Sequence, residues 1–479
     1  MAGEFLRVSP ARVCDLTRRG SLPRMSESAV RNLDHPEQPP VPRRRIVIAS
    51  MVGTSVEFFD FYIYATAAVL VFPVLFFPKG DDTAALLSSF ATFGLAFVAR
   101  PIGSVLFGHF GDRIGRKATL VGSLLTMGIA TFVIGLLPTF DQVGYLAPAL
   151  LALMRFCQGL GLGGEWSGAA LLATETAEKG KRAWAAMWPQ LGAPIGFFFA
   201  NGMFLLLIFG LDFDAKTSPA DHAFMTWGWR IPFLASAIMV VIGLYVRLKL
   251  TETPVFAKAV EEGKKVKTPL AEVVKTSWRQ LIAGTFIMVA TYTLFYIVTT
   301  WIVSYGTGKV TDASGVKLSF SYADFLQLQI IAVLFFAGFV MVSGRLADKY
   351  GRRAFLLVIT VMIIVFGLFF ALILDPSSMN NGRMLFFLIL GMTLMGLTFG
   401  PMSAILPELF PTNVRYTGSG ISYNVSSIIG AAVAPFIATW IVADFGVGWV
   451  GVYLAVAACT TLIALLSVRE TKTVDLSEV

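Results

Sequence analysis

The chain has 479 residues, of which 56% are hydrophobic and 14% are charged, and its mean hydropathy is +0.72. Soluble domains carry roughly 25% charged residues, so this composition excludes a soluble globular protein and indicates one that spans a membrane. The net charge of +8 would suit a nucleic-acid partner, but the distribution of the basic residues described below favours a lipid bilayer instead.

The first segment, residues 1–42, is polar and is predicted to be a disordered tail. Twelve apolar runs follow, each close to the roughly 20 residues that a helix needs to cross a hydrocarbon core of about 30 Å. They cover residues 46–76, 83–107, 118–138, 143–172, 183–210, 229–247, 281–305, 324–343, 354–374, 384–406, 416–442 and 447–468. The sequence therefore predicts an all-α polytopic membrane protein with twelve transmembrane helices.

The longest polar segment between spans, residues 251–279, divides the chain into two six-helix halves. We predict an N-terminal half at 43–250, a C-terminal half at 280–469 and a tail at 470–479. Most of the 38 Lys and Arg residues lie in the connections on one side of the predicted membrane. The opposite side carries Lys79, Lys216, Arg230, Lys309, Lys317 and Arg383. By the positive-inside rule, both termini are predicted to be cytoplasmic, in the inner membrane of a bacterium.

The two halves repeat one another. GHFGDRIGRK at 108–117 follows the second span, and GRLADKYGRR at 344–353 follows the eighth. Glu175 and Arg182 follow the fourth span, and Glu408 and Arg415 follow the tenth at nearly the same offset. Two independent features with one offset indicate halves related by an axis along the membrane normal, as in transporters built from parallel repeats.

These loops resemble the signature of the major facilitator superfamily, Gly-x-x-x-Asp-Arg-x-Gly-Arg-Arg/Lys. The second loop departs from it at Lys349, where the signature has Arg. VEFFDFYIY, ARPIGSVLFGHFGDRIGRK, RFCQGLGLGGEW and WGWRIPF resemble the metabolite:proton symporter branch, which is similar to the sugar porters. The resemblance covers roughly residues 45–470 and implies the two-half major facilitator fold.

The loop charges are predicted to act as a gate. Acids placed at helix N-termini and the neighbouring basic cluster can bridge the ends of helices and hold the cytoplasmic side shut; the family resemblance implies the same role. The predicted gating residues are Gly108, Asp112, Arg113, Gly115, Arg116, Glu175, Arg182, Asp348, Arg352, Glu408 and Arg415. The alternative, that these are positive-inside anchors, explains the basic residues but not the repeated acids.

Five ionisable residues fall deep inside predicted spans, all in the N-terminal half. They are Glu57, Asp60, Arg100, Arg155 and Glu165. Each costs at least roughly 2.5 to 3.5 kcal/mol near the bilayer centre, which makes it a functional candidate. At about 1.5 Å per residue, Asp60 and Arg155 lie near the midplane and the others lie on the cytoplasmic side of it.

A carboxylate facing an Arg at low dielectric can cycle, because protonation of the acid removes the attraction and frees the Arg for another anion. In sugar-porter relatives an acid in span 1 and an Arg in span 4 have this part, and the resemblance implies it for Asp60 and Arg155. The alternative is a static ion pair that only fixes packing. Glu57, Arg100 and Glu165 fit a structural or gating lattice at least as well as direct proton transfer.

The spans of the C-terminal half offer neutral hydrogen-bonding groups, which suit a polar solute held between the halves. The predicted substrate contacts are Arg155, Gln158, Gln190, Tyr64, Tyr292, Tyr296 and Asn424. Most of the Ser and Thr residues of spans 7 and 11 are expected to make helix–helix contacts instead.

Together these features predict a proton-coupled symporter that imports a small polar metabolite, with a carboxylate-bearing solute favoured, by rocker-switch alternating access. A proton-coupled efflux antiporter and uptake of a zwitterionic osmolyte or a sugar are the alternatives. The sequence has no phosphate-binding glycine loop with Lys and no metal-type spacing of its three cysteines, so we predict no enzyme activity, metal or cofactor. The expected partners are solute, protons and lipid, and we expect a monomer.

Overall fold

A computed structural model describes residues 43–472 except 79, 115, 164, 176, 179, 216, 220, 249–268 and 412–413. The predicted tail at 1–42, most of the inter-half segment and the last residues of the chain lie outside the described part.

The N-terminal half is built from helices joined by short turns. They are α2 (Arg43–Leu70), α3 (Phe72–Leu75), α4 (Asp82–Ile114), α5 (Arg116–Ile134), α6 (Phe140–Val143), α7 (Leu146–Leu162), α8 (Glu165–Glu175), α9 (Arg182–Gln190), α10 (Gly192–Gly210), the π-helix η2 (Phe224–Gly228) and α11 (Arg230–Leu248).

The C-terminal half follows the same plan. Its elements are α13 (Pro269–Thr276), α14 (Trp278–Tyr296), the π-helix η3 (Ile297–Trp301), α15 (Ile302–Gly306), α16 (Tyr322–Tyr350), α17 (Arg352–Leu368), α18 (Phe370–Ile373), the 3-10 turn η4 (Pro376–Ser378), α19 (Asn381–Glu408), α20 (Arg415–Ser427), the π-helix η5 (Ile428–Ala432), α21 (Ala434–Phe445) and α22 (Val447–Ser467).

These helices account for the twelve predicted spans, but several spans are broken. The fourth consists of α7 and α8, the fifth of α9 and α10, the seventh of α14, η3 and α15, and the eleventh of α20, η5 and α21. Within the described residues, eight helices are long and apolar enough to cross a membrane alone, and nine if the bent pair at 352–378 counts as one. Breaks of this kind are frequent at functional sites of transporters.

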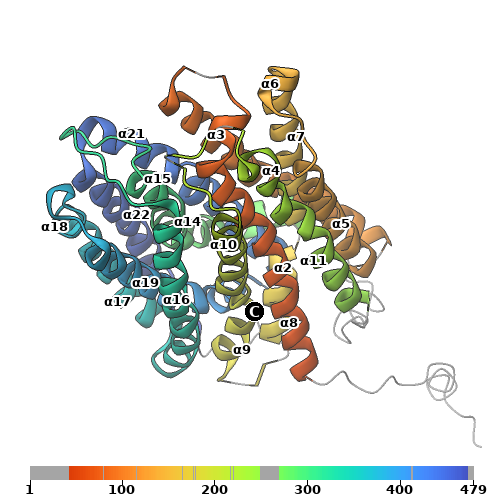
Figure 1. The fold of residues 1–479 in the computed structure, drawn as a ribbon. Coiled ribbons are helices and arrows are strands. Elements are labelled where there is room, and N and C mark those ends of the chain that lie inside the picture. The colour runs from red at the N-terminus through yellow and green to blue at the C-terminus, as the bar shows by residue number, and fades with distance from the viewer. Residues whose placement is uncertain are drawn as a thin grey trace, which may run out of the picture. The chain divides into compact units, whose positions relative to one another are not determined.

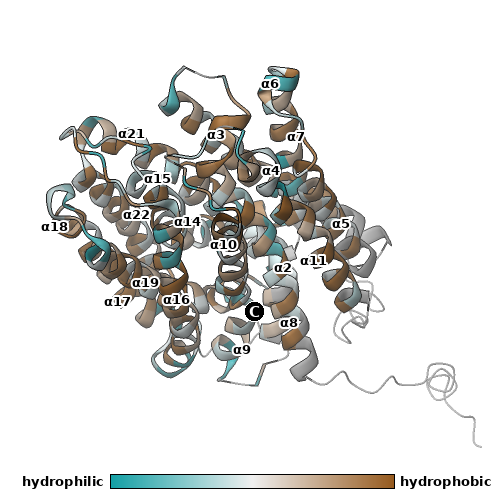
Figure 2. Cartoon of the chain, viewed as in Figure 1, coloured by the Kyte–Doolittle hydropathy of each residue, from teal (hydrophilic) through white to brown (hydrophobic). Residues whose placement is uncertain are grey.

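The apolar side chains that cover the bundle are exposed rather than buried. Leu206, Ile238 and Ile463 are 74%, 65% and 68% exposed, and Figure 2 shows α10 and α11 mainly brown along their length. Large apolar side chains at such exposure are suited to a hydrocarbon surrounding. The fold therefore presents a lipid-facing surface around an interior in which buried polar side chains lie among apolar ones.

Close approach of α4 to α7 brings two of the deep arginines together. A Cβ at Gly159 would lie 2.2 Å from the carbonyl oxygen of Ala96, and one at Gly163 would lie 2.0 Å from that of Arg100. Only glycine permits backbones this close. The glycine-rich stretch at 159–164 therefore sets the spacing of the helices that carry Arg100 and Arg155.

The two ends of the bundle can be told apart by their connections. We call the end at which α4 meets α5 and α16 meets α17 the motif end, because both loop motifs lie there, and the other the opposite end. In Figure 1 the motif end, with α9, is at the bottom, and α3 and α6 are at the top. Helix α16 packs on α9 and α10, so the halves meet along most of its length.

Candidate transport site and gates

Asp60 on α2 and Arg155 on α7 are both completely buried. Asp60 Oδ2 accepts a hydrogen bond of 3.1 Å from the Thr131 hydroxyl. Arg155 Nη1 donates to Gln158 Oε1 at 3.0 Å, and Gln158 Nε2 donates to Thr131 Oγ1 at 2.7 Å. Asp60 and Arg155, both in the described part of the chain, form no direct ion pair within 4 Å. Thr131 and Gln158 connect them instead.

Aromatic rings enclose the Arg155 guanidinium. Its central carbon lies 4.0 Å from the ring centre of Tyr64, 4.5 Å from that of Phe61 and 4.9 Å from that of Phe93. Nε also donates to the Phe93 carbonyl at 3.4 Å. Ring faces stabilise a desolvated cation through their quadrupoles. Tyr64, a predicted substrate contact, is therefore placed as part of the wall around Arg155.

Arg100 on α4 shares one of these rings with Arg155. Its guanidinium lies 5.2 Å from the centre of Phe61 and 4.9 Å from that of Phe97. Glu57, one turn from Asp60, is 5% exposed and lies within electrostatic reach of Arg100. The predicted second layer of charge thus has two of its members close together, while the side chain of Glu165 is outside the described part.

The C-terminal half contributes Tyr296 to the same aromatic cluster. Its ring centre lies 6.1 Å from that of Phe61, 5.6 Å from Phe93 and 5.4 Å from Phe97. The cluster therefore joins the two halves directly beside both buried arginines. Because Tyr296 contacts rings of the other half, these contacts would change when the halves move relative to one another.

A second aromatic contact crosses between the halves nearer the motif end. Trp166 of α8 stacks on Tyr423 of α20, with centroids 3.8 Å apart and planes 5° apart. The ring centre of Tyr292, a predicted substrate contact, lies 5.5 Å from that of Tyr423. Neither Trp166 nor Tyr423 is among the predicted substrate contacts, although each is a large aromatic side chain in a polar part of a span.

Gln190 and Asn424, both predicted substrate contacts, make bonds between the halves. Gln190 Oε1 accepts from Trp166 Nε1 at 3.1 Å, and its Nε2 donates to the Phe399 carbonyl at 3.0 Å. Asn424 Nδ2 donates to Ser104 Oγ at 3.1 Å and to the Gly163 carbonyl at 3.0 Å. In this conformation both amides close the bundle.

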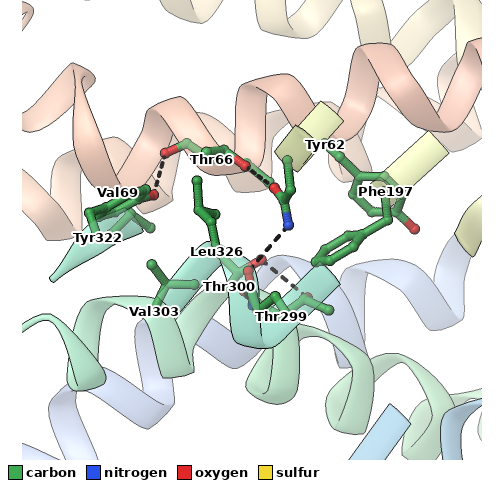
Figure 3. A pocket seen from close by; sticks show the side chains of 12 residues that line it. Tyr62, Thr66, Val69, Phe197, Thr299, Thr300, Val303, Tyr322 and Leu326 are labelled. Atoms are coloured by element: carbon green, nitrogen blue, oxygen red, sulfur yellow. Dashed lines mark hydrogen bonds between the residues drawn. The ribbon is translucent and has the colours of Figure 1, made fainter. Parts of the chain in front are cut away.

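A network of neutral groups closes the halves nearer the opposite end. The Thr66 hydroxyl donates to Asn201 Oδ1 at 2.9 Å, Asn201 Nδ2 donates to Gln329 Oε1 at 3.2 Å, and Tyr322 donates to the Thr66 carbonyl at 3.2 Å. Gln329 Nε2 donates to the Thr299 carbonyl at 2.7 Å. Figure 3 shows these groups around a pocket whose free volume is about 10 Å³, room for about one water molecule.

Sequence reasoning missed this outer network, although amides inside apolar spans 5 and 8 were a usable signal. Thr299 lies in η3, where the wider π turn disturbs the regular backbone ladder. Its carbonyl is therefore available to an amide from another helix, which period-based analysis of spans does not anticipate.

At the motif end, Asp348 of the second loop motif caps a helix of the other half. Its Oδ1 and Oδ2 accept hydrogen bonds from the backbone N–H groups of Ala183, at 3.1 Å, and Trp184, at 2.9 Å, in the first turn of α9. A carboxylate is favoured at a helix N-terminus by the orphan donors and by the dipole. The contact ties α16 to α9 across the interface between the halves.

An ion lattice extends from that cap. Arg352 Nη2 lies 3.0 Å from Asp348 Oδ1, and Arg352 Nε lies 3.3 Å from Glu408 Oε2. Arg182 Nη1 of the N-terminal half lies 3.8 Å from Glu408 Oε1. Four predicted gating residues thus meet in one cluster, while Arg415, also buried, donates to the Phe410 carbonyl at 3.2 Å.

The first loop motif cannot be placed in the same detail. The side chains of Asp112, Arg113, Arg116 and Glu175 and the glycines of that loop, Gly108 and Gly115, lie outside the part of the chain described at side-chain level. Their gating role remains a prediction.

The start of the C-terminal tail packs on the second motif. The Glu470 carboxylate accepts from the backbone N–H groups of Arg352 at 2.8 Å and Arg353 at 3.1 Å, which begin α17. Gly351 has φ +99°, and a Cβ there would lie 2.5 Å from Glu470 Oε2. Thr471 donates to Glu408 at 2.6 Å. The first residues of the tail predicted at 470–479 are therefore part of the lattice.

A two-half helical bundle with a polar midplane site and closures at both ends is the architecture of a secondary transporter. The sequence matches the "Sugar (and other) transporter" family over residues 46–479. The chain belongs to this family of the major facilitator superfamily, and it is a transporter rather than an enzyme.

Relatives of known sequence cover almost the whole chain. It is 56% identical over 450 residues to the "Inner membrane metabolite transport protein YhjE" of Escherichia coli (strain K12), covering 93% of this chain and 99% of that one. It is 31% identical over 433 residues to the "Shikimate transporter" of the same organism, covering 90% and 95%.

The fold also matches solved structures. A structure of the proton:xylose symporter XylE bound to 6-bromo-6-deoxy-D-glucose superposes with a TM-score of 0.66 at 18% identity, over 91% of this chain and 98% of that one. At that identity the match establishes the fold.

Proposed function

We propose that this transporter is a proton-coupled symporter that imports a small carboxylate-bearing metabolite across the bacterial inner membrane, with the motif end and both termini in the cytoplasm. The observation that carries the proposal is the buried chain from Asp60 through Thr131 and Gln158 to Arg155. It connects an acid that could take up a proton, through two side chains, to a charge that could bind an anion. The name of the shikimate transporter relative supports the solute class, since shikimate is a carboxylate.

Coupling follows from the cost of unbalanced charge in a dry interior. While Asp60 is ionised, its charge and that of Arg155 compensate one another. When Asp60 takes a proton from the outer side, Arg155 keeps a charge with no counter-ion, and binding a solute carboxylate restores the balance. Proton and solute therefore enter the site together, and neither is favoured alone.

Alternating access requires that the closures break one at a time. The neutral network around Asn201 and Gln329 would open towards the outside, and the ion lattice around Arg352 and Glu408 would open towards the cytoplasm. Bonds between the halves are present at both ends of this structure. We therefore assign it to an occluded stage of the cycle, with one chain as the transport unit.

Uptake of a zwitterion is the second candidate, and one observation favours it. Glu57 and Arg100 lie within electrostatic reach of one another beside the aromatic cluster of Phe61 and Phe97. A carboxylate could face Arg100 while a cationic group faces Glu57 and the ring faces. This would use the second layer for binding rather than gating.

Transport by purified protein in liposomes with an imposed inward proton gradient tests the proposal. The panel consists of succinate, citrate and shikimate as carboxylates, glycine betaine and proline as zwitterions, and xylose as a sugar. We expect gradient-dependent accumulation of at least one carboxylate, abolished by a protonophore. Accumulation of zwitterions alone would select the second candidate. Export of preloaded solute driven by the inward gradient would overturn symport.

A further inference from the structure

We propose that Thr131 is a positioning residue for proton coupling, and that its hydroxyl and the amide of Gln158 relay the charge state of Asp60 to Arg155. The inference rests on the proposed proton coupling and adds the path by which it works. Thr131 lies on α5, in which the sequence analysis named only Arg116, at the first residue of the helix, and its side chain is completely buried.

The directions of the two hydrogen bonds between Arg155 and Thr131 are fixed by the arginine. Arg155 can only donate, so Gln158 Oε1 must accept from it, and the other end of the amide, Nε2, must donate to Thr131. Thr131 then has its single proton left for an acceptor. Two acceptors lie in reach: Asp60 Oδ2 at 3.1 Å and the Met127 carbonyl at 3.0 Å.

With Asp60 ionised, every donor in the chain points from the cation to the anion. A hydroxyl prefers a carboxylate to a neutral carbonyl, because the charge-assisted bond is roughly twice as strong. Donation to Asp60 also makes the Thr131 oxygen a better acceptor for Gln158, and that in turn strengthens the bond from Gln158 to Arg155. The ionised state therefore holds the Arg155 guanidinium in place.

With Asp60 protonated, the carboxyl itself becomes a donor. It can donate to the Thr131 oxygen while the Thr131 proton turns to the Met127 carbonyl, a rotation about one bond that leaves both helices in place. The oxygen then accepts two bonds, so its bond to Gln158 weakens and Arg155 is held less firmly. Arg155 Nη2, which has no acceptor among the residues that the structure describes, is then available to a solute anion.

Other ionisable side chains surround the relay without joining it. They are Glu57, Tyr62 and Tyr64 on α2, Arg100 on α4 and Tyr296 on α14. Among the described residues, the Tyr64 hydroxyl donates to Thr92 instead, and the hydrogen bonds that connect Asp60 to Arg155 are those of Thr131 and Gln158. The direct path from acid to base therefore runs through α5.

The relay can be tested without knowing the solute, by infrared difference spectroscopy of the full-length protein in lipid during a pH titration. The Asp60→Asn variant identifies the carboxyl band of Asp60 by its loss. In Thr131→Val, which removes the hydroxyl at nearly constant volume, we expect that band to shift to higher wavenumber, because the carboxyl loses a hydrogen bond. Thr131→Ser should return it to the wild-type position.

Gln158→Leu separates a relay from a local contact, since Gln158 touches Thr131 but not Asp60. A smaller shift to lower wavenumber is expected, opposite to that of Thr131→Val, because the Thr131 oxygen then accepts from the Asp60 carboxyl alone and that bond strengthens. Thr126→Val is the matched control and should leave the band unchanged, because the Thr126 hydroxyl on the same helix donates to the Gly122 carbonyl at 2.8 Å and to no other group among the described residues.

The outcomes distinguish this inference from the proposed function. A carboxyl band that Asp60→Asn does not remove would mean that Asp60 does not titrate, which overturns proton coupling and the relay with it. An Asp60 band that is unchanged in Thr131→Val overturns the relay alone. A shift in Thr131→Val with none in Gln158→Leu also overturns it, because the signal then ends at Thr131.

Discussion

The two halves of this transporter repeat each other in sequence but bury different chemistry. In the N-terminal half, Asp60, Arg100 and Arg155 lie deep inside the bundle. In the described part of the C-terminal half, the buried ionic cluster of Arg352 and Glu408 lies at the motif end, and Tyr292, Tyr296 and Asn424 occupy the deeper positions.

This difference indicates a division of labour. A deep charge is expensive and is retained only where its neutralisation does something, so we place energy coupling in the N-terminal half. Neutral groups bind and discriminate at lower cost, so we expect the C-terminal half to shape the solute site. Substitutions in the two halves should therefore impair transport in different ways.

The largest effect on solute binding is expected from Arg155→Lys. A planar fork that holds Gln158 and faces three rings is replaced by a point charge. Loss of about 3 kcal/mol of charged hydrogen bonding corresponds to roughly 100-fold weaker solute binding. The measurement is the concentration dependence of solute exchange. Arg230→Lys is the control, because Arg230 donates to the Gly135 and Leu137 carbonyls away from the site; equal affinity in the two variants would move the binding site.

Glu408→Gln tests the ionic part of the C-terminal half. Removing this acid takes from Arg182 and the buried Arg352 the counter-charge that they share, while Arg352 keeps Asp348; breaking a buried pair costs up to about 3–5 kcal/mol. We expect the motif end to open. Spin labels at the exposed positions Lys181 and Tyr350 should report a new, longer distance in most molecules.

An unchanged distance distribution in Glu408→Gln would show that the lattice does not hold the motif end closed. Asp324→Asn is the matched control, since Asp324 is an acid at the start of α16 at the opposite end. It should leave the distance between the two labels as in the unmodified chain.

Asn201→Leu should have a smaller effect, at the opposite end. It removes two neutral hydrogen bonds, to Thr66 and Gln329, worth about 1–3 kcal/mol together. Spin labels at Tyr145 and Phe445, which are 75% and 55% exposed, should show a minor open population. An opening as complete as that of Glu408→Gln at its own end would erase the distinction between a charged and a neutral closure.

Tyr292→Phe is expected to have the smallest effect and to be the cleanest test of the neutral half. The ring beside Tyr423 remains and one hydroxyl is lost. Solute affinity should fall by up to roughly tenfold, the value of one neutral hydrogen bond, while the accumulation ratio under a proton gradient stays as in the wild type. Loss of accumulation with affinity intact would place coupling in both halves.

Much of the fold follows from local pattern. Apolar runs of spanning length and the two copies of the loop motif predicted the twelve-helix, two-half architecture, because a bilayer imposes helix length and forbids unpaired backbone. The broken spans escaped this reasoning, since the span that contains η3 is buried on nearly all sides and has no single apolar face whose phase a π turn would shift. The packing of Glu470 on α17 escaped it too, because a tail contact depends on tertiary structure.

The site was predictable in its charges and not in its connections. The free-energy cost of an ionisable side chain near the bilayer centre singled out Asp60 and Arg155. Helical spacing within α2 and α7, however, gives no information about a third helix between them. Thr131 is one of several hydroxyls in apolar spans, most of which bond their own backbone. Its hydrogen bond to Asp60 becomes evident only once the position of α5 relative to α2 is known.

Proton-driven accumulation by Asp60→Asn in liposomes is the most direct test of the central claim. We predict that the variant exchanges external for internal solute at close to the wild-type rate but brings solute only to equal concentrations on the two sides, because its site no longer takes up a proton. Accumulation by Asp60→Asn to the wild-type level under the same gradient would contradict the account.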